Sequence, residues 1–192
     1  MQPVDRSEIL PIGEYEKIRE HFRARVMDEK RARRIHLGPH ITAVLENRDT
    51  VMLQIQEMLR TERITAEPAI LHEITTYNDL VPGERQVSMT FFVEIPDREQ
   101  RDRMLVELAG LEDEVALEIA GIPYKFTGKR EGAEPGRTTA VHYLKCDLTD
   151  DAVASLKQGA SAGVALVVSH PKYSVRVDLS PMTVQKLAEE LA

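Results

Sequence analysis

The sequence predicts an α+β fold, with a helix-rich N-terminal third followed by a mostly antiparallel sheet and flanking helices. Between residues 14 and 77, apolar residues recur at steps of three and four, the period of an amphipathic helix. From residue 86 onward, short runs of alternating apolar residues are separated by Gly and Pro, which is typical of strands and turns. We expect a single domain over 1–192, and the alternative is a helical subdomain, 1–80, beside a sheet-containing part, 81–192.

The first helix is expected over residues 14–36. Its apolar residues lie on one face, and Gly38-Pro39 follows as a combined C-terminal signal and breaker. The residues of this stripe are Tyr15, Ile18, Phe22 and Val26. The second half of the helix is charged on nearly every side, so it offers a polar surface.

Two further helices are expected in the N-terminal third, after a short strand "HITAVLE". The stretch "TVMLQIQEMLRTERI", residues 50–64, gathers its apolar side chains on one helical face, and Asn47 or Asp49 can cap its start. The third helix runs from Glu67 to about Tyr77, with a proline tolerated in its first turn.

The remainder of the chain predicts strands separated by short helices. "QVSMTFFVEI" alternates cleanly, a capping box begins a helix at Asp97, and "VALEI" with "PYKFTGK" predicts a hairpin. A glycine-bearing segment, 128–137, is expected to be a hairpin tip, and "TTAVHYLKCDL" is expected to be a strand. Thr149 caps a short helix, "AGVALVVSH" is apolar on both faces and belongs in the centre of a sheet, and Ser180 starts the last helix.

Composition narrows the classes of function. The net charge of −7 argues against nucleic acid as a partner, although residues 17–34 hold eight Lys or Arg against three acids. No run of about 18 apolar residues exists and the N-terminus lacks a signal-peptide core, so we expect a cytoplasmic bacterial-type protein without a membrane span. Cys146, the single cysteine, is predicted to be buried in a strand and a poor nucleophile.

Glu62 is predicted to project from the middle of the apolar face of the second helix. An unpaired carboxylate in an apolar layer costs several kcal/mol, which leaves three interpretations open. The helix bends or frays so that Glu62 reaches water, or an arginine of the basic helix pairs with it, or it binds a metal ion together with Glu57 and His72 or Glu73. The arginines considered for the ion pair are Arg23, Arg33 and Arg34.

Two histidines and a carboxylate form the alternative metal site. His142 lies in a predicted strand, His170 ends the apolar strand, and Glu94 ends another. If these strands are neighbours, the three side chains could bind zinc or ferrous iron. Isolated histidines are more often hydrogen-bonded structural residues. No catalytic motif is present, so the catalytic residues are unknown and no cofactor is indicated, apart from a divalent metal in this alternative.

Several phrases carry a family resemblance. The segment "EYEKIREHFRARVMDEKRARRIHLGPHITAVLENRDTVMLQIQEMLRTERI", followed by "YNDLVPGE", "MTFFVEIPD", "AVHYLK" and "SHPKY", resembles the bacterial domain of unknown function number 3501 over about residues 8–190. "QIQEMLRTERI" is the most specific phrase. The resemblance implies no established activity. It implies genes encoded near rubrerythrin-like proteins and an iron–sulfur oxidoreductase, hence an accessory role in redox or peroxide metabolism.

The leading hypothesis is therefore a non-catalytic binding or accessory protein whose partners are rubrerythrin-like or iron–sulfur redox proteins. Its charged helices offer the docking surface, with Glu57 and Arg60 as candidate partner-binding residues, and a homo-oligomer is compatible with it. The alternative is a metal-binding protein or metal-dependent enzyme that uses His142, His170 and Glu94.

Overall fold

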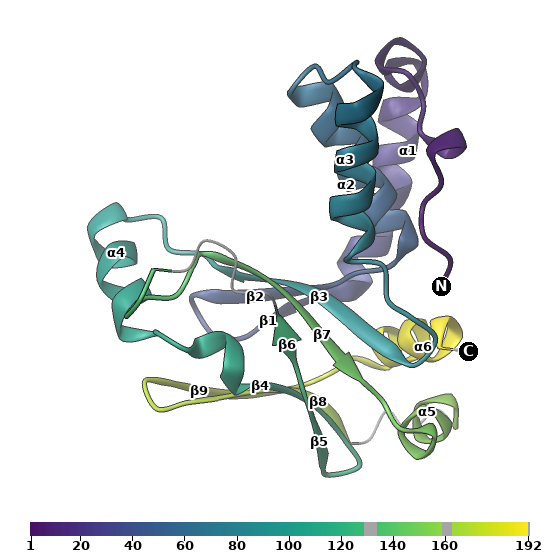
Figure 1. Cartoon of the computed structure of the whole chain (residues 1–192). Helices are drawn as coiled ribbons and strands as arrows, with labels where there is room; N and C mark the ends of the chain where they lie inside the picture. The colour runs from purple at the N-terminus through teal and green to yellow at the C-terminus, as the bar shows by residue number, and fades with distance from the viewer. Residues whose placement is uncertain (129–133, 159–162, 192) are drawn as a thin grey trace.

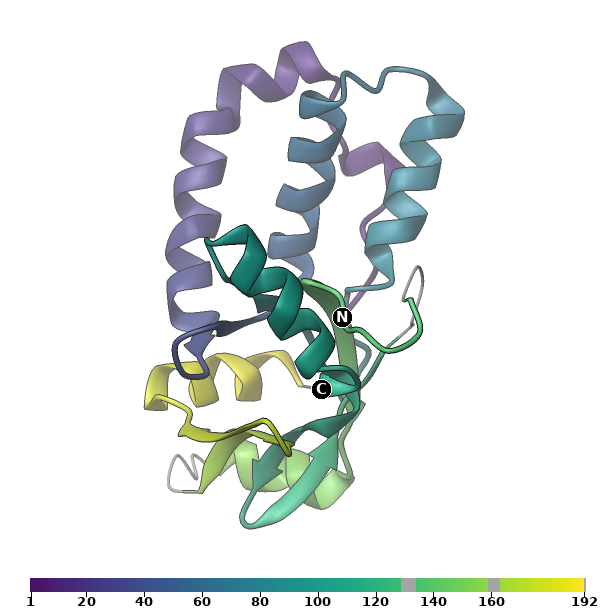
Figure 2. The ribbon, with the colours of Figure 1, turned by 90° about the vertical axis from the view of Figure 1, so that its left-hand side faces the viewer.

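The computed structural model describes residues 1–128, 134–158 and 163–191. Within them the chain forms two stacked antiparallel sheets and an arm of three helices that rises steeply from one end of the first sheet (Figure 1). The same arrangement is seen from the side in Figure 2, where the arm stands above the sheets and α4 (Arg98–Glu107) lies in front of them. The predicted α+β class, with its helix-rich N-terminal third, is confirmed.

The first sheet, called sheet 1, has five strands in the order β1-β2-β3-β7-β6, and the second, called sheet 2, has four in the order β5-β4-β8-β9. All neighbouring strands are antiparallel. The strands of sheet 1 are β1 (Arg34–His36), β2 (Ile41–Leu45), β3 (Gln86–Val93), β6 (Thr127–Gly128) and β7 (Val141–Asp147). Those of sheet 2 are β4 (Val115–Ile119), β5 (Ile122–Lys125), β8 (Val164–His170) and β9 (Tyr173–Asp178).

The main core fills the space between the two sheets. Alternate residues of β3, including Met89 and Phe91, point into it and are fully buried, as the period-two pattern predicts. On β7 the residues that face this core are Leu144 and Cys146. The helices α5 (Asp150–Lys157) and α6 (Pro181–Glu190) add apolar side chains to the same core, such as Leu156. The opposite face of sheet 1 is therefore available to the arm.

The arm consists of α1 (Ile12–Arg33), α2 (Arg48–Thr61) and α3 (Glu67–Asn78). Its α2 and α3 build a second cluster of buried side chains with the N-terminal segment. This cluster contains Val4, Ile9, Val51, Ile55, Leu59, Ile70, Ile74, Tyr77, Leu80 and Val81. Asn47 caps α2, because its side chain accepts a hydrogen bond from the amide of Thr50 at 2.9 Å.

The structure corrects the predicted end of the first helix and the predicted arrangement of the strands. The first helix ends at Arg33 rather than near residue 36, because Arg34–His36 forms β1 at the edge of sheet 1. Residues 173–178 form β9, which was not predicted, and the strands divide into two sheets rather than one. The predicted tip at 128–137 lies largely outside the described residues, which stop at Gly128 and resume at Glu134.

Candidate functional site

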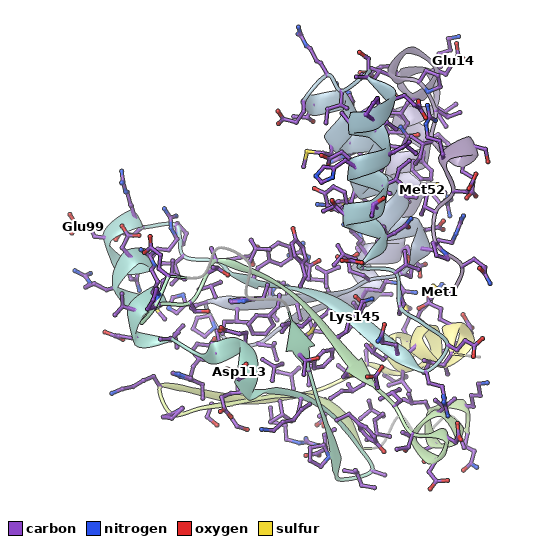
Figure 3. The ribbon with its side chains drawn as sticks, in the orientation of Figure 1. Met1, Glu14, Met52, Glu99, Asp113 and Lys145 are labelled. Carbon is purple, nitrogen blue, oxygen red and sulfur yellow. The ribbon has the colours of Figure 1, made fainter. Side chains whose placement is uncertain are left out.

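A cleft of about 960 Å³ lies between α3 and strand β7, at the inner angle where the arm meets sheet 1. Figure 3 shows one of its lining residues, Lys145, at the foot of the arm. The cleft is lined by His72, Thr75, Thr76, Tyr77, Asp79, Leu80, Glu112, Thr127, Gly128, Thr139, Val141, His142, Tyr143 and Lys145. Its volume falls in the range of small-molecule binding sites.

One wall of the cleft is the face of α3 that does not enter the arm's core. Ile70, Ile74 and Tyr77 face that core at helical spacing, so the residues between them are turned outward. His72, Thr75, Thr76 and Asp79 are accordingly exposed and lie along the cleft. A polar helical face therefore borders the cleft.

The other wall is the outward face of β7. Because successive side chains of a strand point to opposite faces, burial of Leu144 and Cys146 turns Val141, Tyr143 and Lys145 away from the core. Val141 is 40% exposed and Tyr143 is 46% exposed, although both are large apolar side chains. The strand pattern thus leaves an apolar patch inside the cleft.

A chain of hydrogen bonds lies at the edge of the cleft. The Thr138 hydroxyl donates to Oε2 of Glu112 at 2.9 Å. The hydroxyl oxygen of Thr138 also lies 2.9 Å from Nε2 of His142. A threonine hydroxyl has one hydrogen, so Nε2 of His142 must carry the hydrogen that it shares with Thr138. The tautomer of this imidazole is therefore set by a buried threonine and a buried glutamate.

Behind the cleft, a buried carboxylate lies among hydroxyl groups. Glu46 accepts a hydrogen bond from Thr90 at 2.6 Å and another from the Thr50 hydroxyl, and its side chain is buried. The pKa of Tyr143 is raised, first by burial and then by the charge of Glu46. Ser88, on the same face, has a buried hydroxyl for which the structure provides no hydrogen-bond partner. Burial and the Glu46 charge therefore move the pKa of this phenol further above neutral pH.

Lys145 is the lysine of the cleft lining, and its ammonium group contacts the protein backbone. The ammonium of Lys145 donates to the carbonyl of Val81 at 3.3 Å. The pKa of Tyr77 is raised, mainly by burial, with smaller contributions from Tyr143 and Glu73 that also raise it. The lining therefore combines phenol, hydroxyl, imidazole and ammonium groups with a small apolar patch.

The three residues of the predicted metal site are not brought together. His142 is bound to Thr138 in sheet 1, whereas His170 ends β8 in sheet 2 and its Nε2 lies 3.3 Å from the carbonyl of Ala109. Glu94 is exposed and accepts from the Thr42 hydroxyl at 2.5 Å. Within the described residues, no three His, Cys, Asp or Glu side chains are grouped so that they could hold a metal ion. The two histidines lie on strands of different sheets, and each contacts its own set of neighbours.

Glu62 does not form the predicted ion pair. It is the residue at which α2 ends, its side chain is exposed, and none of the ion pairs described for the chain includes it. The interpretation in which the helix ends and Glu62 reaches water is the one the geometry matches. The Glu62 carboxylate therefore lies outside the apolar face of α2.

Arg33 is instead the buried arginine, and the structure corrects its partner. It contacts Glu29 one turn earlier in α1, at 2.8 Å, and Glu190 of α6. Its side chain is only 1% exposed. Of the other two candidate arginines, Arg34 lies 3.9 Å from Glu94 and Arg23 is exposed.

The pKa of Glu29 is lowered, because hydrogen bonds from Lys186 and Arg33 outweigh the opposing effect of burial. The Asn47 amide also donates to Glu190, at 2.9 Å. This cluster therefore joins the end of α1 to α6 and to the start of α2.

The candidate partner-binding residues are engaged within the arm. Glu57 accepts two hydrogen bonds from Arg19, both at 2.8 Å, and one from the Tyr15 hydroxyl at 2.6 Å. These bonds, that of Arg19 above all, lower the pKa of Glu57. Arg60 donates to Glu16 at 2.6 Å. Both side chains thus connect α1 to α2.

Cys146 is buried in β7, and burial raises its pKa to about 12. Reasoning from the sequence did not identify the cleft, because its two walls, α3 and β7, lie about 65 residues apart in the chain. The alternation in "TTAVHYLKCD" could have identified the outward face of β7, but not its neighbour α3.

Fold and cleft together define the class: a two-sheet α+β protein with a helical arm and a cleft at their junction. Residues 3–191 match the family described as "Protein of unknown function (DUF3501)", and the chain belongs to this family. The match confirms the resemblance found in the sequence. No curated protein matches the chain. A solved structure described as a novel protein of unknown function from Burkholderia pseudomallei K96243 is similar, at 31% identity and a TM-score of 0.90, with 100% of both chains covered.

Among the described helices, none is both long and apolar enough to cross a membrane.

Proposed function

We propose that this chain is a non-catalytic binding or accessory protein and that the cleft between α3 and β7 is its binding surface. The observation that carries the proposal is the exposure of Val141 and Tyr143 inside a hollow of about 960 Å³. Exposed apolar side chains grouped with polar ones in a concave site are typical of ligand and partner sites.

The state of the reactive side chains supports binding rather than catalysis. The Cys146 thiol is buried and stays protonated, whereas a nucleophilic cysteine needs a lowered pKa and access. His142 uses Nε2 to donate to Thr138, and His170 contacts a backbone carbonyl. These contacts position the two imidazoles as structural groups.

The cellular context of the proposal comes from the family resemblance. It implies rubrerythrin-like or iron–sulfur redox proteins as partners, hence an accessory role in redox or peroxide metabolism in the cytoplasm. We also propose a second copy of the chain as a partner, in a homo-oligomer. The experiment below detects each of these by mass.

The test is co-purification of the tagged chain from its own cells, analysed by native mass spectrometry, which detects bound proteins and small molecules alike. Val141→Asp places a charge in the cleft, and Ile122→Asp places one on β5, at a residue that is 57% exposed and outside the cleft lining. We expect the bound species to be lost from Val141→Asp and kept by Ile122→Asp, with both variants folded by circular dichroism. Equal retention by both variants, or no bound species on the unmodified chain, would contradict the proposal.

A further inference from the structure

Three threonine hydroxyl groups of the cleft offer lone pairs rather than hydrogens. Thr75 donates its hydroxyl hydrogen to the carbonyl of Leu71 at 2.9 Å, and Thr139 donates to the carbonyl of Val141 at 2.8 Å. Thr127 donates to the carbonyl of Lys145 at 3.4 Å. A threonine has a single hydroxyl hydrogen, so each of these oxygens can only accept a further hydrogen bond. A ligand that meets them must supply donors.

The apolar part of the cleft suits a cation on a short stem. The ring of Tyr143 is about half exposed beside Val141 on the same face of β7. An aromatic face attracts an ammonium or guanidinium group, and the neighbouring apolar surface can contact the methylene groups of its stem. Tyr143 is a neutral phenol at neutral pH, and burial and the charge of Glu46 raise its pKa further.

The negative charges of the chain also favour a cationic ligand. The chain carries a net charge of −7, and two acidic residues, Asp79 and Glu112, line the cleft. Two nitrogen groups of the lining donate to protein oxygens, since Lys145 donates to the Val81 carbonyl and His142 to Thr138. A negatively charged molecule concentrates cations near its surface.

We propose that the cleft binds a small organic cation, a primary amine or a guanidinium on a short apolar stem. The inference rests on the proposed function, because it names the ligand class of the same cleft. In this proposal the N–H groups of the cation donate to the lone pairs of Thr75, Thr127 and Thr139, and its positive charge lies over the Tyr143 ring.

The test is isothermal titration calorimetry of the full chain at neutral pH with n-butylamine and agmatine, and with n-butyrate as a control of similar size and opposite charge. We expect both cations to bind one site at least tenfold more tightly than butyrate, and to bind more weakly at higher salt. Tyr143→Leu is expected to weaken cation binding roughly two- to fivefold, while Tyr143→Phe retains the ring and stays within about twofold of the unmodified chain. Ile122→Leu, outside the cleft, serves as the matched control.

The ligand class is overturned if butyrate binds as tightly as the cations, if neither cation gives measurable heat at millimolar concentration, or if Tyr143→Leu binds like the unmodified chain. Any of these results leaves the co-purification test intact. Loss of bound species from Val141→Asp alone would then keep the cleft as a binding surface and assign it another ligand.

Discussion

Replacing Arg33 with methionine tests the buried ion-pair cluster that joins the arm to α6. The change keeps an unbranched side chain of similar length but leaves Glu29 and Glu190 without their shared cation. Removal of one partner of a buried pair costs about 3–5 kcal/mol when the remaining charge is fully buried. Each carboxylate here keeps about a fifth of its side-chain surface, 21% and 20%, so water recovers part of this cost. We expect the free energy of unfolding to fall by about 2–4 kcal/mol.

The assay is urea unfolding followed by far-ultraviolet circular dichroism, with Glu62→Leu as the matched control. Glu62 is exposed beyond the last turn of α2, so its replacement is expected to change stability by less than about 0.5 kcal/mol. If Arg33→Met and Glu62→Leu have the same small effect, the cluster does not stabilise the fold and the reasoning is refuted.

The pH dependence supplies a second measurement on the same cluster. Burial raises the pKa of Glu29, but the hydrogen bonds and charges of Lys186 and Arg33 together outweigh burial, so the pKa lies below its ordinary value of 4.5. A lowered folded-state pKa contributes stability that is present above pH 4.5 and is lost as the pH falls through the folded pKa. Unfolding measured below pH 4.5 should therefore show a steeper loss of stability for the unmodified chain than for Arg33→Met.

Three further outcomes follow from the described contacts. Thr138→Val removes a hydrogen bond from buried Glu112 and is expected to lower the free energy of unfolding by about 1–3 kcal/mol. Thr138→Ser keeps the hydroxyl and is expected to keep the stability. Equal stability of the two variants would count against the hydrogen bonds that join Glu112, Thr138 and His142. Cys146 should resist a disulfide reagent at mildly alkaline pH in the native protein and react fully in denaturant, since burial raises its pKa to about 12; rapid native labelling would show that the thiol is accessible. Gly38→Ala should lower stability by more than about 1 kcal/mol, because φ is +77° and the added Cβ would lie 2.5 Å from the Tyr173 hydroxyl oxygen; unchanged urea unfolding would disprove this.

The helix starts were predictable because each depends on a short stretch of sequence. Asp97 accepts a hydrogen bond from the amide of Gln100 at 2.7 Å, and Ser180 accepts one from Thr183 at 3.1 Å, as their positions predicted. The central position of β8 between β4 and β9 was likewise signalled by its apolar residues on both faces.

The division into two sheets and the cleft depend on which distant segments meet, and no local pattern records that. Arg33 illustrates the difficulty, since its partner Glu190 lies 157 residues away in the sequence. Glu62 illustrates the reverse case, because an ideal helix extended past Thr61 placed it on an apolar face that the real helix never reaches. The end of a helix is the least certain feature of a helical pattern.

The most direct test of the cleft as a binding surface is site-specific photo-crosslinking in the protein's own cells. A photoreactive phenylalanine analogue replaces Tyr143 in one variant and Ile122 in another, and both positions carry exposed large apolar side chains. The account predicts a discrete adduct from position 143 and none from position 122. Adducts of equal yield from both positions, or an adduct from position 122 alone, would contradict it.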